Sequence, residues 1–552
     1  MRGTLALALA LTLCLCAFAP ALAEEPALLG NMYLTGERIV KEPVTYRVLY
    51  QSQGATMPDV DPNEMPYYVD VAERTGVNMV FEGVPREIGP ERLATTFASG
   101  DLPDAFVNII TDNDKLTYGP VGALLNVNDY LEYMPLFTDM LANEPMSKAI
   151  ITCPDGNIYT IPQINMWSTW PGDGVYIASQ AFINSKWVEQ LGMEIPVTLD
   201  EFTEYLRGVR DNDLNGNGDP SDEIPLGFLY NNGNDSAEAL LYCPFGIIGN
   251  AKHKNVQDGK FFYAIQDPRF VEAIKYQRAL YSEGLIDPEA YTMDGSRYNA
   301  KGRVEEDVWG VYCAFEVGPI QADKKVEGFG GEDPYYKVLL PLEGADGSRT
   351  WSNQYAGTNA NYMAISGTAK NPEILCRWAD FFFAPDETVQ QLWGLEGIGT
   401  LKTDDGWTIL DARDKAKVGF DPEKNWIGRT TLRTLPSYAS NEVVSKLTYY
   451  YQDTDETFRK DGDTKYPMSK MVAPFAVEQY YPPLLLSFEA NERAAILTTP
   501  IENAMVEKEI DWIMGRGDIE TEWEDFIKKL NAMGLEELTA IHQEVVDRVY
   551  AQ

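Results

Sequence analysis

The stretch TLDEFTEYLRGVRDNDLNGNGDPSDEIPLGFLY, residues 198 to 230, contains three local structural signals in a row. Thr198 and Glu201 form a capping box, which marks the start of a helix. The apolar residues that recur at helical spacing after it are Phe202, Tyr205, Leu206 and Val209. A polar loop follows directly, and the segment EIPLGFLY after the loop has the composition of a strand. The sequence therefore predicts a helix, a loop and a strand in immediate succession inside an α/β domain.

The loop at residues 211–223 has oxygen-bearing side chains at alternate positions. The candidate ligands are Asp211, Asp213, Asn215, Asn217, Asp219, Asp222 and Glu223, with Gly216 at the sixth place. This spacing is that of an EF-type calcium loop, in which the seventh residue contributes its backbone carbonyl and a carboxylate closes the site. Hard oxygen donors without His or Cys favour Ca²⁺ over transition metals. Because a strand replaces the second helix of an EF-hand, the expected role of the ion is structural; a metal-free polar turn is the alternative.

The first residues have the pattern of a secretory signal peptide over residues 1–23. Arg2 precedes an apolar run from Leu5 to Ala19, and the small-residue sequence Ala21-Leu22-Ala23 follows. We therefore expect an exported protein, extracellular or periplasmic, where calcium loops with dissociation constants of roughly 10⁻⁴ to 10⁻³ M stay occupied. A lipid anchor at Cys14 or Cys16 is the less favoured alternative, because Leu precedes each.

The composition narrows the possible functions. With 552 residues the chain is long enough for two or more domains. Its formal charge of −39 would repel nucleic acid and anionic lipid, although acidity in an exported protein more simply favours solubility. Only His253 and His542 are present, which argues against His-rich zinc sites and Ser-His-Asp triads. The mature chain retains four cysteines, for which the sequence leaves burial as single thiols and disulfide pairing equally open: Cys153, Cys243, Cys313 and Cys376.

Strand-like and helix-like patterns alternate along the rest of the chain, as an α/β fold requires. The N-terminal half begins with strands expected at 44–50, 77–85 and 105–110 and helices at 67–75 and 90–98. The C-terminal segment 522–550 reads as two helices interrupted at Gly534.

Several short motifs, in this order, resemble the extracellular solute-binding proteins of oligosaccharide ABC importers, particularly the long members similar to alginate-oligosaccharide binders. The motifs are ASGDLPDAF (98–106), DGNIYTIP (155–162), FINSKWVEQLG with PVTLDEF, the calcium loop with DEIPL, ISGTAKNPEILCRWADFFFAP (365–385), WGLEGI (393–398) and the C-terminal GLEELTAIHQEVVDRVY. The family usually has a lipid-anchor cysteine after its signal, and this chain departs from that pattern.

The resemblance implies an α/β fold of two lobes, the type II periplasmic-binding-protein-like fold, with the ligand in the inter-lobe cleft. By that analogy residues 24–178 and 360–400 form lobe 1, and residues 179–359 and 401–552 form lobe 2 with the calcium loop and the C-terminal helices. The chain would cross near 174–183 and again near 351–361.

Residues at these crossings and at strand ends are the candidates for sugar contact, because pyranose rings stack on aromatic side chains and their hydroxyls pair with polar ones. The candidates are Trp167, Trp170, Trp351, Tyr355, Phe315, Glu316, Gln53 and Asn108.

The resemblance implies a binding protein that acts as a monomer, carries structural Ca²⁺, captures an oligosaccharide and delivers it to ABC permease subunits, with no nucleic-acid partner and no catalysis. A secreted glycoside hydrolase or polysaccharide lyase is the main alternative, although no pair among the 84 acidic residues has diagnostic spacing. A dockerin-like module would need a second calcium loop.

Overall fold

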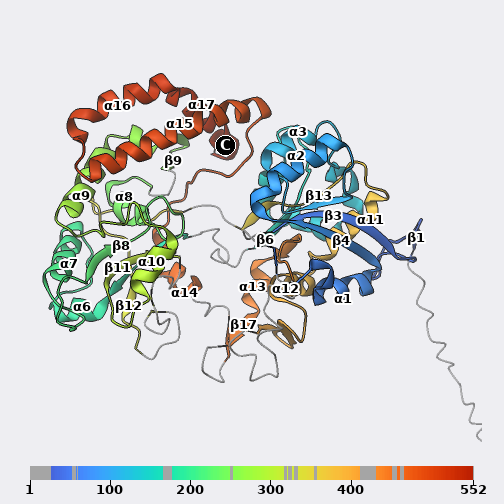
Figure 1. Cartoon of the computed structure of the whole chain (residues 1–552), viewed down its shortest axis with the longest axis horizontal. Coiled ribbons are helices and arrows are strands. Elements are labelled where there is room, and N and C mark those ends of the chain that lie inside the picture. The colour runs from blue at the N-terminus through green and yellow to red at the C-terminus, as the bar shows by residue number, and fades with distance from the viewer. Residues whose placement is uncertain are drawn as a thin grey trace, which may run out of the picture.

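The protein folds into two lobes that lie side by side (Figure 1). The structure, a computed structural model, describes residues 27–52, 57–58, 60–165, 177–248, 253–315, 320, 326–327, 333–353, 357–410, 431–450, 457–459 and 465–550. The predicted signal peptide, residues 1–23, lies outside the described residues.

A six-stranded sheet forms the centre of the first lobe, in the order β16-β6-β13-β5-β3-β4. Its strands are β3 (Val44–Gln51), β4 (Val77–Val84), β5 (Ala105–Val107), β6 (Ile161–Asn165), β13 (Thr358–Ile365) and β16 (Ser437–Ala439). β3 is parallel to β4 and β5, whereas β13 runs antiparallel to β5 and β6. The end of β5 and the start of β13 therefore lie at the same edge of the sheet.

Helices cover both faces of this sheet, because its strands alternate side chains between two apolar layers. In β3, Tyr46, Val48 and Tyr50 pack in one buried cluster and Leu49 packs in the other. The helices of the lobe are α1 (Pro66–Thr75), α2 (Gly89–Ser99), α3 (Asp112–Tyr118), α4 (Pro135–Asn143), α5 (Pro145–Ile151), α11 (Pro372–Phe381) and α12 (Pro385–Trp393). A short hairpin, β1 (Leu28–Leu29) and β2 (Met32–Tyr33), precedes them.

Residues 400–410 and 431–450 belong to the first lobe, whereas the expected assignment gave 401–552 to the second lobe. β16 pairs parallel with β6, so that Tyr438 lies opposite Ile164. A smaller sheet, β14-β15-β17-β18, packs with α12 and α13 through a buried cluster that includes Leu392 and Trp407. Its elements are β14 (Thr400–Thr403), β15 (Gly406–Ile409), α13 (Asn441–Ser445), β17 (Leu447–Tyr450) and β18 (Thr457–Arg459).

The second lobe is built on a four-stranded sheet in the order β12-β7-β11-β8. Its strands are β7 (Gln180–Asn184), β8 (Ile224–Gly227), β11 (Trp309–Ala314) and β12 (Tyr336–Leu339). β11 is antiparallel to β7 and parallel to β8. The packed elements around it are α6 (Ser185–Gln190), α7 (Leu199–Asp211), α8 (Glu238–Tyr242), the hairpin β9 (Lys254–Gln257) and β10 (Lys260–Tyr263), α9 (Arg269–Ser282), α10 (Gly295–Gly302) and α14 (Lys465–Val472).

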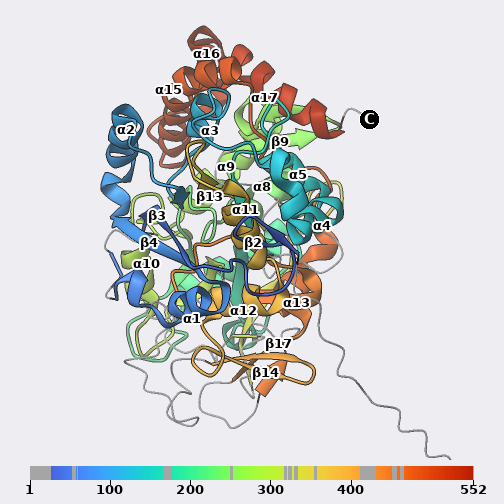
Figure 2. The same cartoon turned by 90° about the vertical axis from the view of Figure 1, so that its right-hand side faces the viewer.

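Three C-terminal helices lie over the second lobe and reach toward the first: α15 (Phe488–Ile513), α16 (Ile519–Met533) and α17 (Leu535–Tyr550) (Figures 1 and 2). α15 packs against α9 and also contacts α3 of the first lobe. Glu509 of α15 is buried in the second lobe, where its Oε2 lies 3.1 Å from His253 Nε2 and its Oε1 accepts from the Tyr242 hydroxyl. Leu485, just before α15, packs in a buried cluster of the first lobe.

Most of the local sequence predictions are confirmed. The helix that begins at the Thr198 capping box is α7, and all four of its predicted apolar residues are buried. Gly534 has a φ of +105°, the left-handed conformation that separates α16 from α17. β5 is shorter than expected, because Asn108 has a φ of +54° and ends the strand after Val107.

Cys153, Cys243, Cys313 and Cys376, for which the sequence leaves disulfide pairing and burial as single thiols equally open, are all buried as single thiols and not joined in disulfide bonds. Within the described part of the chain, no helix combines the length and apolar character needed to cross a membrane.

Candidate functional site

The strand ends where the chain passes between the lobes form the candidate ligand site, and we call them the inter-lobe edges. In the first lobe this edge holds the ends of β3, β5 and β6 and the start of β13. The chain leaves it after Asn165 and enters the second lobe at Gln180; it returns between Trp351 and Thr358. In the second lobe the edge holds the start of β7 and the ends of β8 and β11. Ligands of α/β sheets bind at such carboxyl ends of strands.

Two of the predicted sugar-contact residues lie at these edges. Asn108 follows β5, is half-buried, and donates from Nδ2 to the Gln51 carbonyl at 3.0 Å, which joins the ends of β5 and β3. Phe315 follows β11 in the second lobe and is also half-buried. Its backbone N–H donates to Asp235 Oδ1 at 3.3 Å. Sugar contact by Asn108 and Phe315 remains a prediction.

Trp351 is a core residue, which differs from the exposed stacking position expected for it. Its side chain is 2% exposed, and its indole N–H donates to the Ser179 carbonyl at 3.1 Å. Its backbone pairs with a neighbouring segment, donating to Phe475 O at 2.8 Å and accepting from Val477 N at 3.0 Å. Trp351 therefore fastens the returning chain to the second lobe, and its ring face is not available to a sugar.

The remaining sugar-contact candidates lie outside the described residues. They are Gln53, Trp167, Trp170, Glu316 and Tyr355. Their roles remain predictions from sequence.

A polar cluster that the sequence did not indicate lies at the inter-lobe edge of the first lobe. Asp112, the first residue of α3, accepts at Oδ1 from Asn361 Nδ2 at 2.8 Å and lies 2.9 Å from Lys115 Nζ. The helical spacing of Asp112 and Lys115 was a visible signal of an ion pair. Asn361 is far away in sequence, in β13, so nothing local linked it to them.

The predicted calcium loop is folded back on its own polar groups. Asp213 accepts from three backbone N–H groups through its carboxylate, those of Gly216 at 2.8 Å, Asn217 at 3.1 Å and Gly218 at 2.9 Å. Asn217 Nδ2 donates to Asp222 Oδ2 at 2.6 Å. Asp213 and Asp222 are therefore linked to each other through Asn217.

Glu223 closes the loop from the side of β8. Its Oε1 accepts from the backbone N–H groups of Leu214 at 2.7 Å and Asn215 at 3.1 Å, while its buried Oε2 has no hydrogen-bond partner in the part of the chain that the structure describes. Burial raises the pKa of Glu223, against the opposing effect of these two N–H groups. A bare, buried carboxylate oxygen in a loop that also carries Asp213 and Asp222 fits a hard cation such as Ca²⁺.

Asp211, the first residue of the predicted ligand set, forms a salt bridge with Arg210 instead of contacting the other described side chains of the loop. Its two carboxylate oxygens accept from Arg210, at 2.7 and 2.9 Å, and Arg210 lowers the pKa of Asp211. The structure therefore favours Asp213 over Asp211 as the first ligand of the loop. In the described residues no group of three or more His, Cys, Asp and Glu side chains is assembled with metal-binding geometry.

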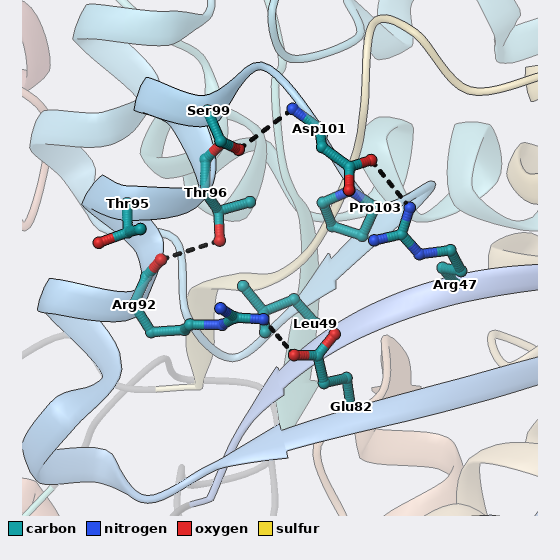
Figure 3. A pocket seen from close by; sticks show the side chains of 9 residues that line it. All are labelled: Arg47, Leu49, Glu82, Arg92, Thr95, Thr96, Ser99, Asp101 and Pro103. Atoms are coloured by element: carbon teal, nitrogen blue, oxygen red, sulfur yellow. Dashed lines mark hydrogen bonds and ion pairs between the residues drawn. The ribbon is translucent and has the colours of Figure 1, made fainter.

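Two surface pockets lie away from the inter-lobe edges. One, of about 150 Å³, lies beside the start of β5, between β3, β4 and α2 (Figure 3). Its arginines are paired, Arg47 with Asp101 at 3.0 Å and Arg92 with Glu82. The other, of about 220 Å³, adjoins α12, and Arg74 there is held by acidic side chains. These paired charges leave neither pocket as a strong candidate for the ligand site.

Comparison with known proteins identifies the family. No protein-family profile matches the chain. The fructooligosaccharide ABC transporter substrate-binding protein FusA of Streptococcus pneumoniae serotype 4 is 30% identical over 510 residues, which cover 89% of this chain and 88% of FusA. The structure of FusA in complex with kestose has a TM-score of 0.73 at 27% identity and covers 92% of this chain and 100% of that one. An EF-hand mutant of FusA in complex with fructo-nystose has a TM-score of 0.74 at 26% identity, with the same coverage.

More distant solved structures share the fold. A solute-binding protein from Bifidobacterium longum infantis, associated with an HMO-binding ABC transporter, has a TM-score of 0.76 at 20% identity and covers 92% of this chain and 99% of that one. The alginate-binding protein AlgQ2, without calcium ion, has a TM-score of 0.64 at 19% identity and covers 93% of this chain and 100% of that one.

The chain thus belongs to the substrate-binding proteins of ABC transporters. The resemblance noted in the sequence and the two-lobed α/β fold expected from it are both confirmed.

Proposed function

We propose that this protein captures an oligosaccharide between its lobes and delivers it to the permease of an ABC importer, and that its ligand is a fructooligosaccharide. The observation that carries the proposal is the match to FusA, at 30% identity across nearly the whole of both chains. The inter-lobe edges support it, because they bring half-buried polar and aromatic side chains such as Asn108 and Phe315 to the facing ends of two sheets.

Calorimetric titration of the calcium-loaded protein with kestose and nystose tests the substrate class. We expect micromolar or tighter binding, about −8 kcal/mol. Galactose-based and uronate oligosaccharides of similar length are the controls. Binding of a control sugar in preference to both fructans would refute the fructooligosaccharide assignment and leave the transport role standing.

The same experiment addresses catalysis. The relatives described above are binding proteins, so the ligand should be recovered intact after long incubation with pure protein. Steady release of shorter sugars would favour the glycoside hydrolase or lyase alternative.

We further propose that the protein works as a monomer, for which light scattering with and without ligand is the test.

We propose that Ca²⁺ fastens α7 to β8 in the second lobe and does not touch the sugar. The ligands would be Asp213, Asn215, Asp219, Asp222 and Glu223. Asn215 Nδ2 already donates to Asp222 Oδ1 at 3.2 Å, and the buried Glu223 Oε2 has no hydrogen-bond partner among the described residues. Bound there, the ion would neutralise carboxylates that the fold brings together.

We also propose that residues 1–23 direct export, so that the protein works outside the cytoplasm.

A further inference from the structure

Three polar side chains meet at the inter-lobe edge of the first lobe, and we call them the Asp112 cluster: Asp112, Lys115 and Asn361. The register of β5 against β13 places Asn361 just beyond the last paired residues, Val107 and Met363. α3, which starts at Asp112, lies beside α15 of the C-terminal helices in both views (Figures 1 and 2). The cluster therefore sits where the first lobe faces the rest of the molecule.

Exposure within the cluster is uneven. The Lys115 side chain is 0% exposed, whereas that of Asp112 is 55% exposed. Lys115 Nζ has no partner other than Asp112 among the described residues, and the buried Asn361 Oδ1 has no hydrogen-bond partner there. Removing an ammonium group from water is unfavourable, and a solvated partner returns little of that cost. Replacing a buried ion pair with apolar side chains is often neutral or stabilising, so stability alone does not account for the pair.

The arrangement holds Asp112 as an ionised hydrogen-bond acceptor. Although the Asp112 side chain is 55% exposed, partial loss of its hydration acts to raise its pKa; Lys115 and Asn361 outweigh this effect, and the pKa is lowered. Both partners bind the same atom, Oδ1. The described residues supply no hydrogen bond to the second carboxylate oxygen, Oδ2, so it can accept from a donor outside the cluster.

We propose that Asp112 accepts hydrogen bonds from hydroxyl groups of the oligosaccharide, with Lys115 and Asn361 as the positioning residues that fix its carboxylate. The inference rests on the proposed function and identifies a contact for it. Hydroxyl groups form short, strong hydrogen bonds with a carboxylate. A uronate ligand would instead place its own negative charge near Asp112, which disfavours binding. The subsite therefore selects neutral oligosaccharides over acidic ones.

The test compares Asp112→Asn with Asp139→Asn, which removes an equal charge from an exposed position on α4. Kestose and nystose are titrated into each calcium-loaded variant, and unliganded melting temperatures are recorded. We expect Asp112→Asn to weaken binding about tenfold or more, since a charge-assisted hydrogen bond is lost, with little change in melting temperature. Asp139→Asn should bind like the parent.

Lys115→Met and the double variant Asp112→Asn/Lys115→Met separate positioning from simple structural support. If Lys115 acts through Asp112, the double variant binds kestose no more weakly than Asp112→Asn alone. Additive losses in the double variant would overturn the positioning role.

Three outcomes separate this inference from the proposed function. If the parent binds kestose and Asp112→Asn binds it equally well, the subsite is refuted and the proposed function stands. If the parent prefers an alginate trisaccharide, selection for neutral sugars is refuted. If the parent binds no oligosaccharide of the panel, the proposed function fails, and the subsite with it.

Discussion

Calcium removal should lower the stability of the second lobe, and this loss should depend on the carboxylate of Glu223. This side chain is 6% exposed, and one of its oxygens has no partner within the described ranges, so without a cation the fold buries an incompletely compensated carboxylate. Occupancy stabilises the folded state by RT ln(1 + [L]/Kd), about 2.7 kcal/mol when calcium is a hundredfold above Kd. With a Kd of about 10⁻⁴ M, roughly 10 mM calcium meets that condition.

Scanning calorimetry with calcium and with a chelator measures this stabilisation of the folded state by bound calcium. For a domain of about 150–250 residues, about 1 kcal/mol shifts the melting temperature by roughly 2–4 °C, so chelation should lower it by about 5–10 °C. Glu223→Gln should abolish the response, and its calcium-free form should melt no lower than the calcium-free parent, because the buried charge is gone.

Asp211→Asn is the matched control, since Asp211 is held by Arg210. This variant should keep the full calcium response, and Asp213→Asn should lose it. The reasoning about the loop is refuted if Asp211→Asn loses the response while Asp213→Asn keeps it, or if a chelator changes nothing in protein shown to contain calcium.

Three further outcomes follow from burial and position. Burial raises the pKa of Asp380 from 3.8 to about 6, so between these pH values the folded state holds a proton that the unfolded state has lost, and the parent loses stability as pH rises. Relative to the parent, Asp380→Asn should therefore gain about 3 kcal/mol of unfolding free energy between pH 3.5 and 7 in denaturant titrations. A difference that stays constant with pH would contradict this. Trp351→Ala should cost about 3–5 kcal/mol of unfolding free energy, because a core indole is lost; an unchanged melting temperature would show that the ring is not core. Trp167→Ala or Trp170→Ala should weaken kestose binding about tenfold at nearly unchanged melting temperature, and the opposite pattern would identify these residues as core.

Local signals in the sequence predicted individual elements well. The Thr198 capping box and the apolar spacing after it located α7, because caps and periodicity depend on neighbouring residues only. The sequence did not predict α15, because its apolar positions are mixed with charged residues and Pro500 lies inside it. Pro usually ends a helix, and here packing against α9 and α17 maintains one.

Contacts between segments far apart in the chain could not be predicted from such local signals. The first lobe extends to about residue 450 because the three-residue strand β16 pairs with β6, some 270 positions earlier, and so short a strand has little local signature. The sequence places Trp351 near a crossing between the lobes, but its backbone pairing with the chain at 475–477 joins segments too far apart in sequence to be predicted locally. The Asp112 cluster depends in the same way on Asn361, a contact set by the register of β13 against β5.

Titration of the pure, calcium-loaded protein with kestose, followed by analysis of the recovered sugar, tests the central claim most directly. We expect saturable binding of one kestose per chain with micromolar or tighter affinity, about −8 kcal/mol, and complete recovery of intact kestose. Absence of binding to kestose and to every other oligosaccharide tried, or steady conversion of the sugar to shorter products, would contradict it.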